Sequence, residues 1–117
     1  MSSLRALVTA GGTREPIDDV RVITNLSRGR FGAAIARALV AQGIETTVLG
    51  SREALSLVEG EPAITGVPFS TYSDIARELE RLTADPPDLL FMAAAVSDYV
   101  PVAQPGKIRS DADELVI

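Results

Sequence analysis

The sequence of 117 residues contains no cysteine, histidine or tryptophan. The absence of cysteine excludes disulfides, thiolate nucleophiles and thiolate metal sites. The absence of histidine excludes Ser-His and Cys-His nucleophilic catalysis, histidine general-base chemistry and most zinc sites within this chain. Any chemistry must therefore rest on carboxylates, hydroxyls, amides, backbone groups, ten arginines and a single lysine, Lys107.

Long apolar runs and a surplus of positive charge are also missing. No run approaches the roughly 20 residues of a membrane helix, and the first residues, Met-Ser-Ser-Leu-Arg, lack a signal-peptide core. We therefore expect a cytoplasmic protein with no membrane contact. The net charge of -5 argues against a nucleic-acid partner. It is compatible with small anionic ligands, because a local basic loop can focus the field.

The composition and the apolar pattern predict one α/β domain over residues 1–117. Hydrophobic residues make up 46% and charged residues 23% of the chain, as in globular domains. A strand over residues 4–8, a helix from about residue 29 to Gly43 and a strand over residues 46–49 would form a βαβ unit with parallel strands. The expected buried face of this helix is Phe31, Ile35, Ala38 and Leu39.

The second half of the sequence continues the alternation of strands and helices. We expect a short helical turn over residues 53–58 and a strand over residues 64–69. A second clear helix follows, started by a capping box of Thr71 with Asp74 or by Ser70. Residues 89–96 form a nearly continuous apolar run, which is typical of a central parallel strand covered on both faces. A further strand is expected over residues 115–117.

The long loop over residues 9–32 joins the first strand to the first helix. Long ordered loops usually carry function. Gly11 and Gly12 would let a ligand approach the backbone, and Ser27 is a plausible N-cap whose helix has free N–H groups and a positive dipole end. Four arginines, Arg14, Arg21, Arg28 and Arg30, lie in the same loop. The loop therefore predicts a site for a phosphate-bearing ligand, the alternative being a solvated connection.

A second loop follows the apolar strand at residues 97–99. Ligands of open parallel sheets bind beyond the carboxyl ends of the strands, so we expect this loop to face the first one across a crevice. Asp98 could accept a hydrogen bond or bind Mg²⁺, or could simply form a turn. Lys107 could clamp an anionic substrate, or be an ordinary surface lysine.

Two further candidates each have a structural alternative. The amide of Asn25 could contact a reacting carbonyl, or could hold the loop by bonding to its own backbone. The small residues Ala94 and Ala95 would let a ligand lie against the strand, or would simply pack tightly under a helix.

Three segments, TAGGTREPIDDVRVITNLSRGRFG, MAAAVSDY and GKIRS, together resemble the phosphopantothenate-cysteine ligase family, also called phosphopantothenoylcysteine synthetase. The resemblance runs from Leu7 to the last residue. It implies a Rossmann-like, doubly wound, three-layer α/β fold with a mainly parallel sheet that works as a homodimer. It also implies a reaction in which CTP or ATP, with Mg²⁺, activates the carboxylate of 4′-phosphopantothenate. The amine of cysteine then displaces the nucleotide and forms an amide.

The resemblance also implies roles for individual residues. Asn25 would be needed for turnover of the acyl-nucleotide, Lys107 would bind the triphosphate from a flexible loop, and Arg21 would reach into the partner subunit's site. Nucleotide phosphates would be held by Gly12, Ser27, Gly29 and Gly32, and phosphopantothenate by Asn25, Ala94, Ala95 and Asp98. No protein-only metal site is expected. None of these steps requires histidine or cysteine on the enzyme, because the carboxylate is already a nucleophile.

Several residues depart from the pattern of the family. Arg28 and Asp19 replace a serine and a proline, and Arg109-Ser110 replaces two lysines that often follow the flexible-loop lysine. The resemblance covers only the first half of the family's domain, so we expect the second half, with its base-reading loop, to be lacking here or supplied by a separate chain.

Two other functions are compatible with the sequence. One is an NADP-binding Rossmann oxidoreductase domain, in which Arg52, after the second strand, would meet the 2′-phosphate. The long loop in place of a compact G-x-G-x-x-G turn disfavours this reading. The other is a non-catalytic ligand-binding or assembly module that keeps the fold.

Overall fold

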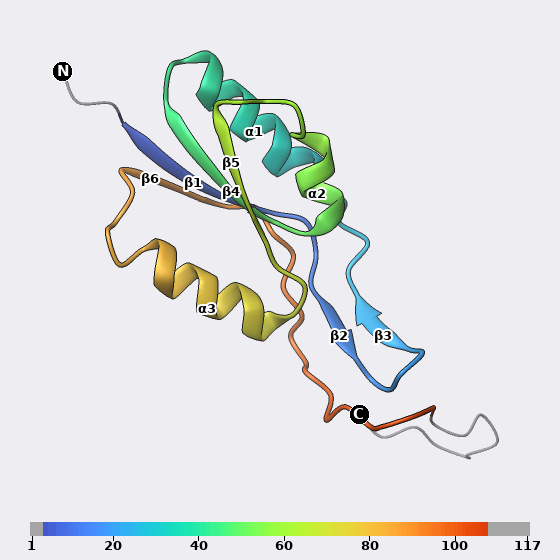
Figure 1. Cartoon of the computed structure of the whole chain (residues 1–117). Helices are drawn as coiled ribbons and strands as arrows, with labels where there is room; N and C mark the ends of the chain where they lie inside the picture. Colours follow the sequence, from blue (N-terminus) through green and yellow to red (C-terminus); the bar gives the residue numbers. More distant parts are fainter. Residues whose placement is uncertain (1–3, 108–117) are drawn as a thin grey trace.

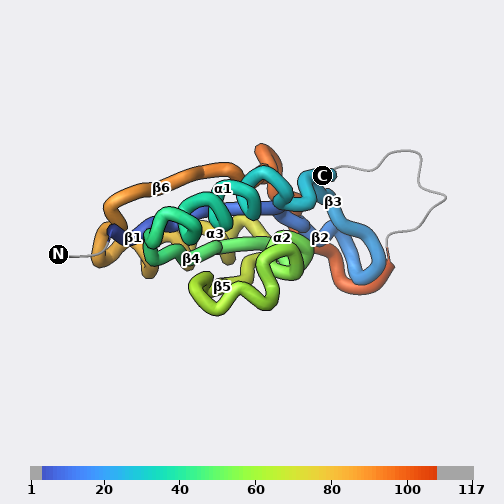
Figure 2. Tube along the Cα trace, turned by 90° about the horizontal axis from the view of Figure 1, so that it is seen from above, coloured from blue at the N-terminus to red at the C-terminus, as the bar shows by residue number. Residues whose placement is uncertain are grey.

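The computed structural model describes residues 4–107, which fold into three layers (Figure 1). The middle layer is a parallel sheet of β1 (Arg5–Ala10), β4 (Glu45–Gly50), β5 (Ile64–Pro68) and β6 (Leu89–Met92), in the order β5-β4-β1-β6. Figure 2 shows these strands side by side in that order. The predicted α/β fold with a mainly parallel sheet is confirmed, whereas the strand expected at residues 115–117 lies outside the described residues.

One face of the sheet is covered by α1 (Arg30–Ala41) and α2 (Arg52–Leu57). Helix α1 approaches β1 closely, because a Cβ on Gly32 would lie only 2.4 Å from the Cβ of Ala10. The buried residues of the helix are Gly32, Ala33, Ala36 and Leu39.

The face predicted for α1 was therefore wrong in part. Phe31 is 74% exposed and Ala38 is also exposed. The helix contacts the sheet mainly through the small residues Gly32, Ala33 and Ala36. Its buried face is therefore rotated away from the apolar face that the sequence predicted. The predicted end of the helix is confirmed, since Gly43 follows the C-cap with a φ of 78°.

The opposite face of the sheet packs against α3 (Tyr72–Leu82), where Ile75, Leu79 and Leu82 meet the core as expected. The predicted capping box is confirmed: the Thr71 hydroxyl accepts from the Asp74 N–H, and the Asp74 carboxylate accepts from the Thr71 N–H. Thr71, not Ser70, is therefore the N-cap.

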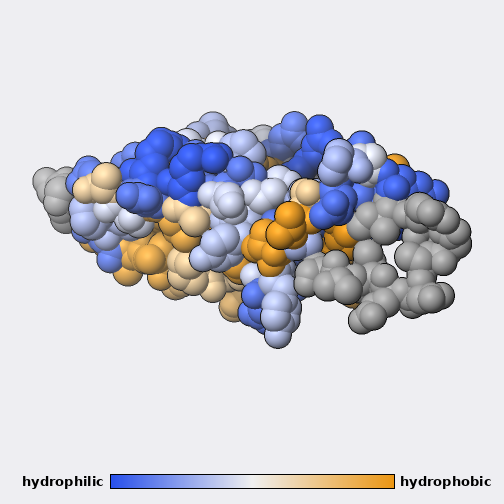
Figure 3. Space-filling view, turned by 90° about the horizontal axis from the view of Figure 1, so that it is seen from below, coloured by the Kyte–Doolittle hydropathy of each residue, from blue (hydrophilic) through white to orange (hydrophobic). Residues whose placement is uncertain are grey.

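Strand β6 is shorter and more exposed than predicted. In the described part of the chain β6 ends at Met92 and pairs only with β1, at the edge of the sheet. Leu90 and Met92 are 48% and 58% exposed. Helix α3 packs against β1, β4 and β5 and leaves the α3 side of β6 largely uncovered, and Figure 3 shows apolar surface beside the charged outer surface of α3. The run is therefore not a central strand among residues 4–107.

The long loop contains a β-hairpin that the sequence analysis missed. Strands β2 (Arg14–Pro16) and β3 (Val22–Thr24) pair antiparallel and project beyond the carboxyl ends of the sheet strands (Figure 1). The β-branched run of β3 and the two aspartates before it are signals of a strand and a turn that could have revealed the hairpin. The hairpin gives the loop its own backbone ladder.

Candidate functional site

The two loops predicted to share a crevice are bonded directly to each other. The Ala95 carbonyl accepts from the Thr13 N–H at 3.1 Å and from Nδ2 of Asn25 at 3.4 Å. The Ala95 N–H donates to the Gly11 carbonyl at 2.7 Å, so that Gly12 and Ala95 pair as one further parallel bridge beyond β6. The two loops therefore lie side by side as predicted, but they touch directly, and residues 94–99 are not among those that line the cleft at this end of the sheet.

Two fully buried threonines hold the second loop in place. Oγ1 of Thr9 accepts from the Ala94 N–H at 3.1 Å, and Oγ1 of Thr13 accepts from the Ser97 N–H at 2.9 Å. These side-chain bonds add to the backbone bonds that Ala93 and Ala95 still donate to Thr9 and Gly11 beyond the end of β6. The backbone from Ala94 to Ser97 is thus fixed against β1.

A cleft of about 650 Å³ opens at the carboxyl ends of β1, β4 and β5. This volume lies in the range of small-molecule sites, roughly 300–1,000 Å³. Three of the predicted site residues, Gly12, Asn25 and Ser27, line it. A Cβ on Gly12 would lie 2.8 Å from the Cβ of Asn25, so only glycine fits between the loop and the cleft wall. The remaining lining residues are Arg14, Thr24, Ser51, Arg52, Glu53, Pro68, Phe69, Ser70, Asp74 and Arg77.

Helix α1 begins without a side-chain cap. Its N-cap is Gly29, which has a φ of 83°, and the first turn contains no acidic residue. The prediction of Ser27 as N-cap was therefore wrong, because the left-handed turn at Gly29 starts the helix two residues later. Uncapped N–H groups and the helix dipole favour an anion at this end.

The backbone at Gly29 is crowded. A Cβ there would lie 2.3 Å from the Cβ of Ala54 and 3.1 Å from the Gly11 nitrogen. This close contact brings the start of α1 against the end of β1 and the side of α2. Beside it, Ser27, Arg28, Gly29 and Arg30 line an open hollow of about 400 Å³. Two guanidinium groups thus flank the free helix end.

The α3 side of the cleft carries charges that are already neutralised. The Thr71 N–H, together with the Ser70 N–H and Arg77, holds the pKa of the Asp74 carboxyl below its usual value, against a smaller opposing effect of burial. Arg77 Nη2 donates to Asp74 Oδ1 at 3.1 Å. Glu15 of β2, which is 2% exposed, accepts from the Tyr72 N–H and so ties the hairpin to the start of α3.

Residues 1–117 match the family model described as the DNA/pantothenate metabolism flavoprotein C-terminal domain. The chain belongs to this family. It is 39% identical, over 117 residues, to the coenzyme A biosynthesis bifunctional protein CoaBC of Mycolicibacterium smegmatis; this alignment covers 97% of the chain and 27% of that protein. The chain thus spans about a quarter of the length of this relative.

Two solved structures of relatives share the fold. A DNA/pantothenate metabolism flavoprotein from Streptococcus pneumoniae is 35% identical with a TM-score of 0.78, covering 86% of this chain and 43% of that one. The C-terminal domain of a CoaBC protein is 35% identical with a TM-score of 0.72, covering 87% and 50%. None of the helices between residues 4 and 107 has the length and apolar character that a membrane-spanning helix needs.

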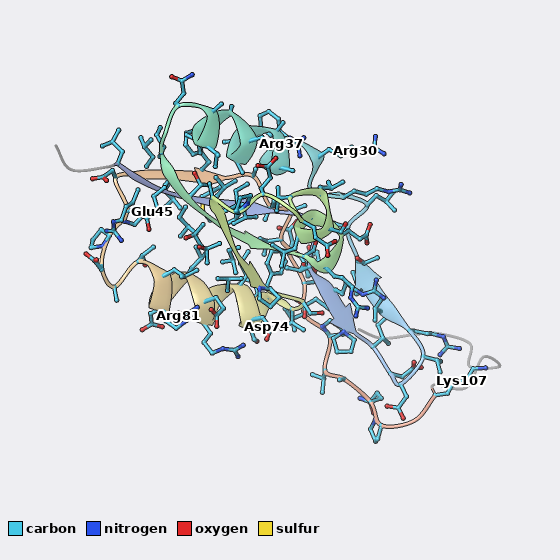
Figure 4. The ribbon with its side chains drawn as sticks, turned by 45° about the horizontal axis from the view of Figure 1, so that its top comes forward. Arg30, Arg37, Glu45, Asp74, Arg81 and Lys107 are labelled. Carbon is cyan, nitrogen blue, oxygen red and sulfur yellow. The ribbon has the colours of Figure 1, made fainter. Side chains whose placement is uncertain are left out.

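Two residues to which the family resemblance gives roles lie together away from the cleft. Arg21 donates to the buried carboxylate of Asp18 at the hairpin tip, at 2.8 Å. Gly106, next to Lys107, exchanges backbone and side-chain hydrogen bonds with Asp19 at the same tip. Figure 4 shows Lys107 at this far end, remote from Arg30 and Asp74. Within one chain, Lys107 is not brought together with Gly29.

The remaining candidates are placed by their neighbours. Ala94 and Ala95 lie beside β1, Gly32 lies against Ala10, and Asp98 is exposed in the loop after β6. Arg14 and Arg52 line the cleft although the sequence analysis gave them no part in the ligase site. Arg52 begins α2 with one residue between it and the end of β4, and that place beyond the end of a parallel strand was the signal that pointed to it.

Proposed function

We propose that this chain forms the carboxylate-activating part of a phosphopantothenate-cysteine ligase of coenzyme A biosynthesis. The observation that carries the proposal is the Ala95 carbonyl, which accepts from both Thr13 and Asn25 and so bonds the second motif segment to Asn25, a residue that lines the cleft. Similarity to a coenzyme A biosynthesis protein supports it. The inserted hairpin between β1 and α1 is unlike the compact turn of dinucleotide-binding oxidoreductases.

The start of α1 is the proposed seat of the nucleotide phosphates. Ser27, Gly29 and Gly32, with Gly12 across the turn, would bring backbone N–H groups and a positive dipole end to the phosphates. Arg28 and Arg30 would add positive charge at the open hollow beside the start of α1. Phosphopantothenate would lie along Ala94 and Ala95, with its acyl end at Asn25 and Asp98 at the open side.

The proposed reaction has two displacements. An oxygen of the substrate carboxylate attacks the α-phosphorus of CTP or ATP, forming an acyl-nucleotide and releasing pyrophosphate. The cysteine nitrogen then attacks the acyl carbon, forms the amide, loses a proton and expels the nucleoside monophosphate. The Asn25 amide nitrogen, which donates one hydrogen bond to the Ala95 carbonyl, would donate its second hydrogen to the acyl oxygen in the second step. The protein contributes mainly position and charge.

The residues fit a magnesium ion that enters with the triphosphate. Between residues 4 and 107 no group of three or more Asp and Glu side chains could hold a metal. Mg²⁺ is often bound by substrate phosphates with only one or two carboxylates, and Asp98 is an exposed carboxylate in the loop after β6. The ion would neutralise phosphate charge.

The hairpin tip is the proposed contribution to a second subunit. Arg21 and Lys107 lie at the same tip, beyond the sheet. We propose a homodimer in which both residues enter the partner's site, Lys107 meeting the triphosphate there. Use of a nucleoside triphosphate would place the reaction in the cytoplasm. The rest of the family's domain, in the same or a separate chain, would complete the sheet beyond β6.

Binding and turnover test the proposal separately. By calorimetry the chain should bind CTP or ATP and 4′-phosphopantothenate. With both present, pyrophosphate release should require Lys107, and should fall at least tenfold in Lys107→Gln but not in Arg81→Gln, an exposed α3 arginine paired with Glu78. Asn25→Ala should still release pyrophosphate but accumulate acyl-nucleotide after cysteine is added. Failure to bind either ligand would refute the proposal, whereas binding without turnover would support a non-catalytic module.

A further inference from the structure

The arginines of residues 4–107 divide into two groups. Arg5, Arg21, Arg77 and Arg81 form ion pairs, and Arg37 donates to the Leu57 carbonyl. Arg14, Arg28, Arg30 and Arg52 have no such partner in this part of the chain. Arg28 and Arg30 flank the start of α1, which belongs to the site already described. Arg14, from the hairpin strand β2, and Arg52, after β4, instead line the cleft, a role that the proposed reaction does not use.

Arg52 lies at the place in the sheet topology where many nucleotide-binding folds contact a ribose. Arg52 comes just after β4, next to β1 in the sheet, at the carboxyl end of the parallel strands. In doubly wound sheets the residue at the end of this second parallel strand meets the ribose of a bound nucleotide. An acidic residue there accepts from the free 2′-hydroxyl, and an arginine accommodates a 2′-phosphate. Here the residues at this place are Ser51 and Arg52.

The charges around Arg52 favour an anion in spite of two acids in the same cleft. Three arginines and the acids Glu53 and Asp74 line it. The Asp74 carboxylate is occupied by Arg77 and by two backbone N–H groups, so it presents little free charge. Arg14 and Arg52 therefore face one uncompensated acid, Glu53, which leaves a positive surplus inside a chain of net charge -5.

The cleft also has room for more than a phosphate. Its volume of about 650 Å³ suits a nucleotide-sized ligand, and it continues from Arg52 to Gly12 at the loop after β1. Ser51 and Ser70, which follow β4 and β5, also line the cleft, and the Ser51 hydroxyl caps α2 by accepting from the Ala54 N–H. A ribose between Arg52 and Gly12 would thus have its phosphorylated hydroxyl at Arg52.

We propose that the β4–β5 side of the cleft is a second anion subsite, in which Arg52, assisted by Arg14, binds a phosphate on the ribose 2′-hydroxyl of a nucleotide. Bidentate guanidinium contacts suit a phosphate dianion. This subsite shares the cleft and Gly12 with the site of the proposed function, but its phosphate contacts, Arg52 and Arg14, are not among the residues proposed for the triphosphate. It implies that the chain responds to a 2′-phosphorylated nucleotide.

The test compares two probes on the whole chain by calorimetry: adenosine 2′,5′-bisphosphate and adenosine 5′-monophosphate. The bisphosphate should bind about tenfold tighter or more, the effect of one hydrogen-bonded charge. Arg52→Gln should remove this preference while leaving the affinity for the monophosphate unchanged, and Arg14→Gln should reduce the preference in part.

Arg81→Gln is the matched control, because it removes the same charge from the exposed face of α3 and should keep the preference. Inorganic phosphate should compete only weakly; equal competition would show that the ribose contributes nothing and would overturn the nucleotide part of the proposal. Equal affinity of the wild type for both nucleotides, or an unchanged preference in Arg52→Gln, would overturn the subsite itself. Neither result would bear on the binding of phosphopantothenate or pyrophosphate release.

Discussion

Replacement of Gly29 by alanine isolates the cost of close packing at the start of α1. Gly29 and Gly43 both have positive φ angles, 83° and 78°. An alanine in this left-handed region costs about 1–2 kcal/mol. No atom lies within 4 Å of a Cβ at Gly43, whereas a Cβ at Gly29 would lie 2.3 Å from that of Ala54. Gly43→Ala therefore reports the backbone cost alone.

Gly29→Ala adds a steric cost to the same backbone cost. The new methyl group must move by about 1 Å to reach ordinary van der Waals contact with the Ala54 methyl at 3.4 Å. Neither methyl group can rotate away, because each is attached directly to the backbone. Overpacking of this kind costs about 1–3 kcal/mol. We expect Gly29→Ala to lose about 2–5 kcal/mol in all, against about 1–2 kcal/mol for Gly43→Ala.

Urea unfolding followed by circular dichroism measures the difference in free energy of unfolding between the two variants, and thermal unfolding measures it as a difference in melting temperature. At about 4 °C per kcal/mol, the melting temperature of Gly29→Ala should lie about 4–12 °C below that of Gly43→Ala. Equal stabilities would show that α1, α2 and β1 do not meet as closely as the structure has them. The close packing of Gly29 against Ala54 would then be refuted.

Three further perturbations test the contacts around the cleft. Thr13→Val removes the acceptor of the Ser97 N–H, so it should lower the free energy of unfolding by about 1–3 kcal/mol and speed amide exchange at Ser97. The control Thr65→Val, on the exposed edge strand β5, should be nearly neutral. Slow amide exchange at Ser97 that survives in Thr13→Val would contradict the contact. Glu15→Gln should cost about 1–2 kcal/mol in urea unfolding, because the α3 end loses a buried carboxylate that accepts from Tyr72, and a neutral result would rule out this role. Asp74→Asn should cost about 1 kcal/mol at pH 7. Because the pKa of Asp74 is lowered in the folded protein, its contribution is complete above the unfolded value, about 4, and is lost as the pH falls through the folded value. The difference between wild type and variant should therefore shrink toward pH 2–3, and a difference independent of pH would contradict the carboxylate's role.

Local signals determined the parts of the fold that depend on neighbouring residues. The alternation of apolar strands with amphipathic helices predicted the α/β class, Gly43 predicted the end of α1, and Thr71 with Asp74 predicted the start of α3. Each of these features is decided within one or two helical turns. The two motif segments also predicted the juxtaposition of their loops, since both follow carboxyl ends of parallel strands.

Tertiary contacts decided the rest. Ser27 has good capping chemistry, but the close contact of Gly29 with Ala54 starts α1 later. Phe31 is apolar yet exposed, because Gly32 lets α1 lie directly on β1. The segment after β6 is held by backbone bonds and by buried threonine hydroxyls that come from the other end of the sequence.

The site itself shows the same division. The sequence by itself determined which residues carry anion-binding chemistry: the glycines and arginines of the long loop, Asn25, and the small residues after β6. Only the tertiary structure decided that Arg14 and Arg52 share a cleft with Asn25, and that Lys107 lies with Arg21 at a hairpin tip. The physical reason is that side-chain chemistry is local, whereas the contacts between β1, α1 and the hairpin join residues far apart in the chain.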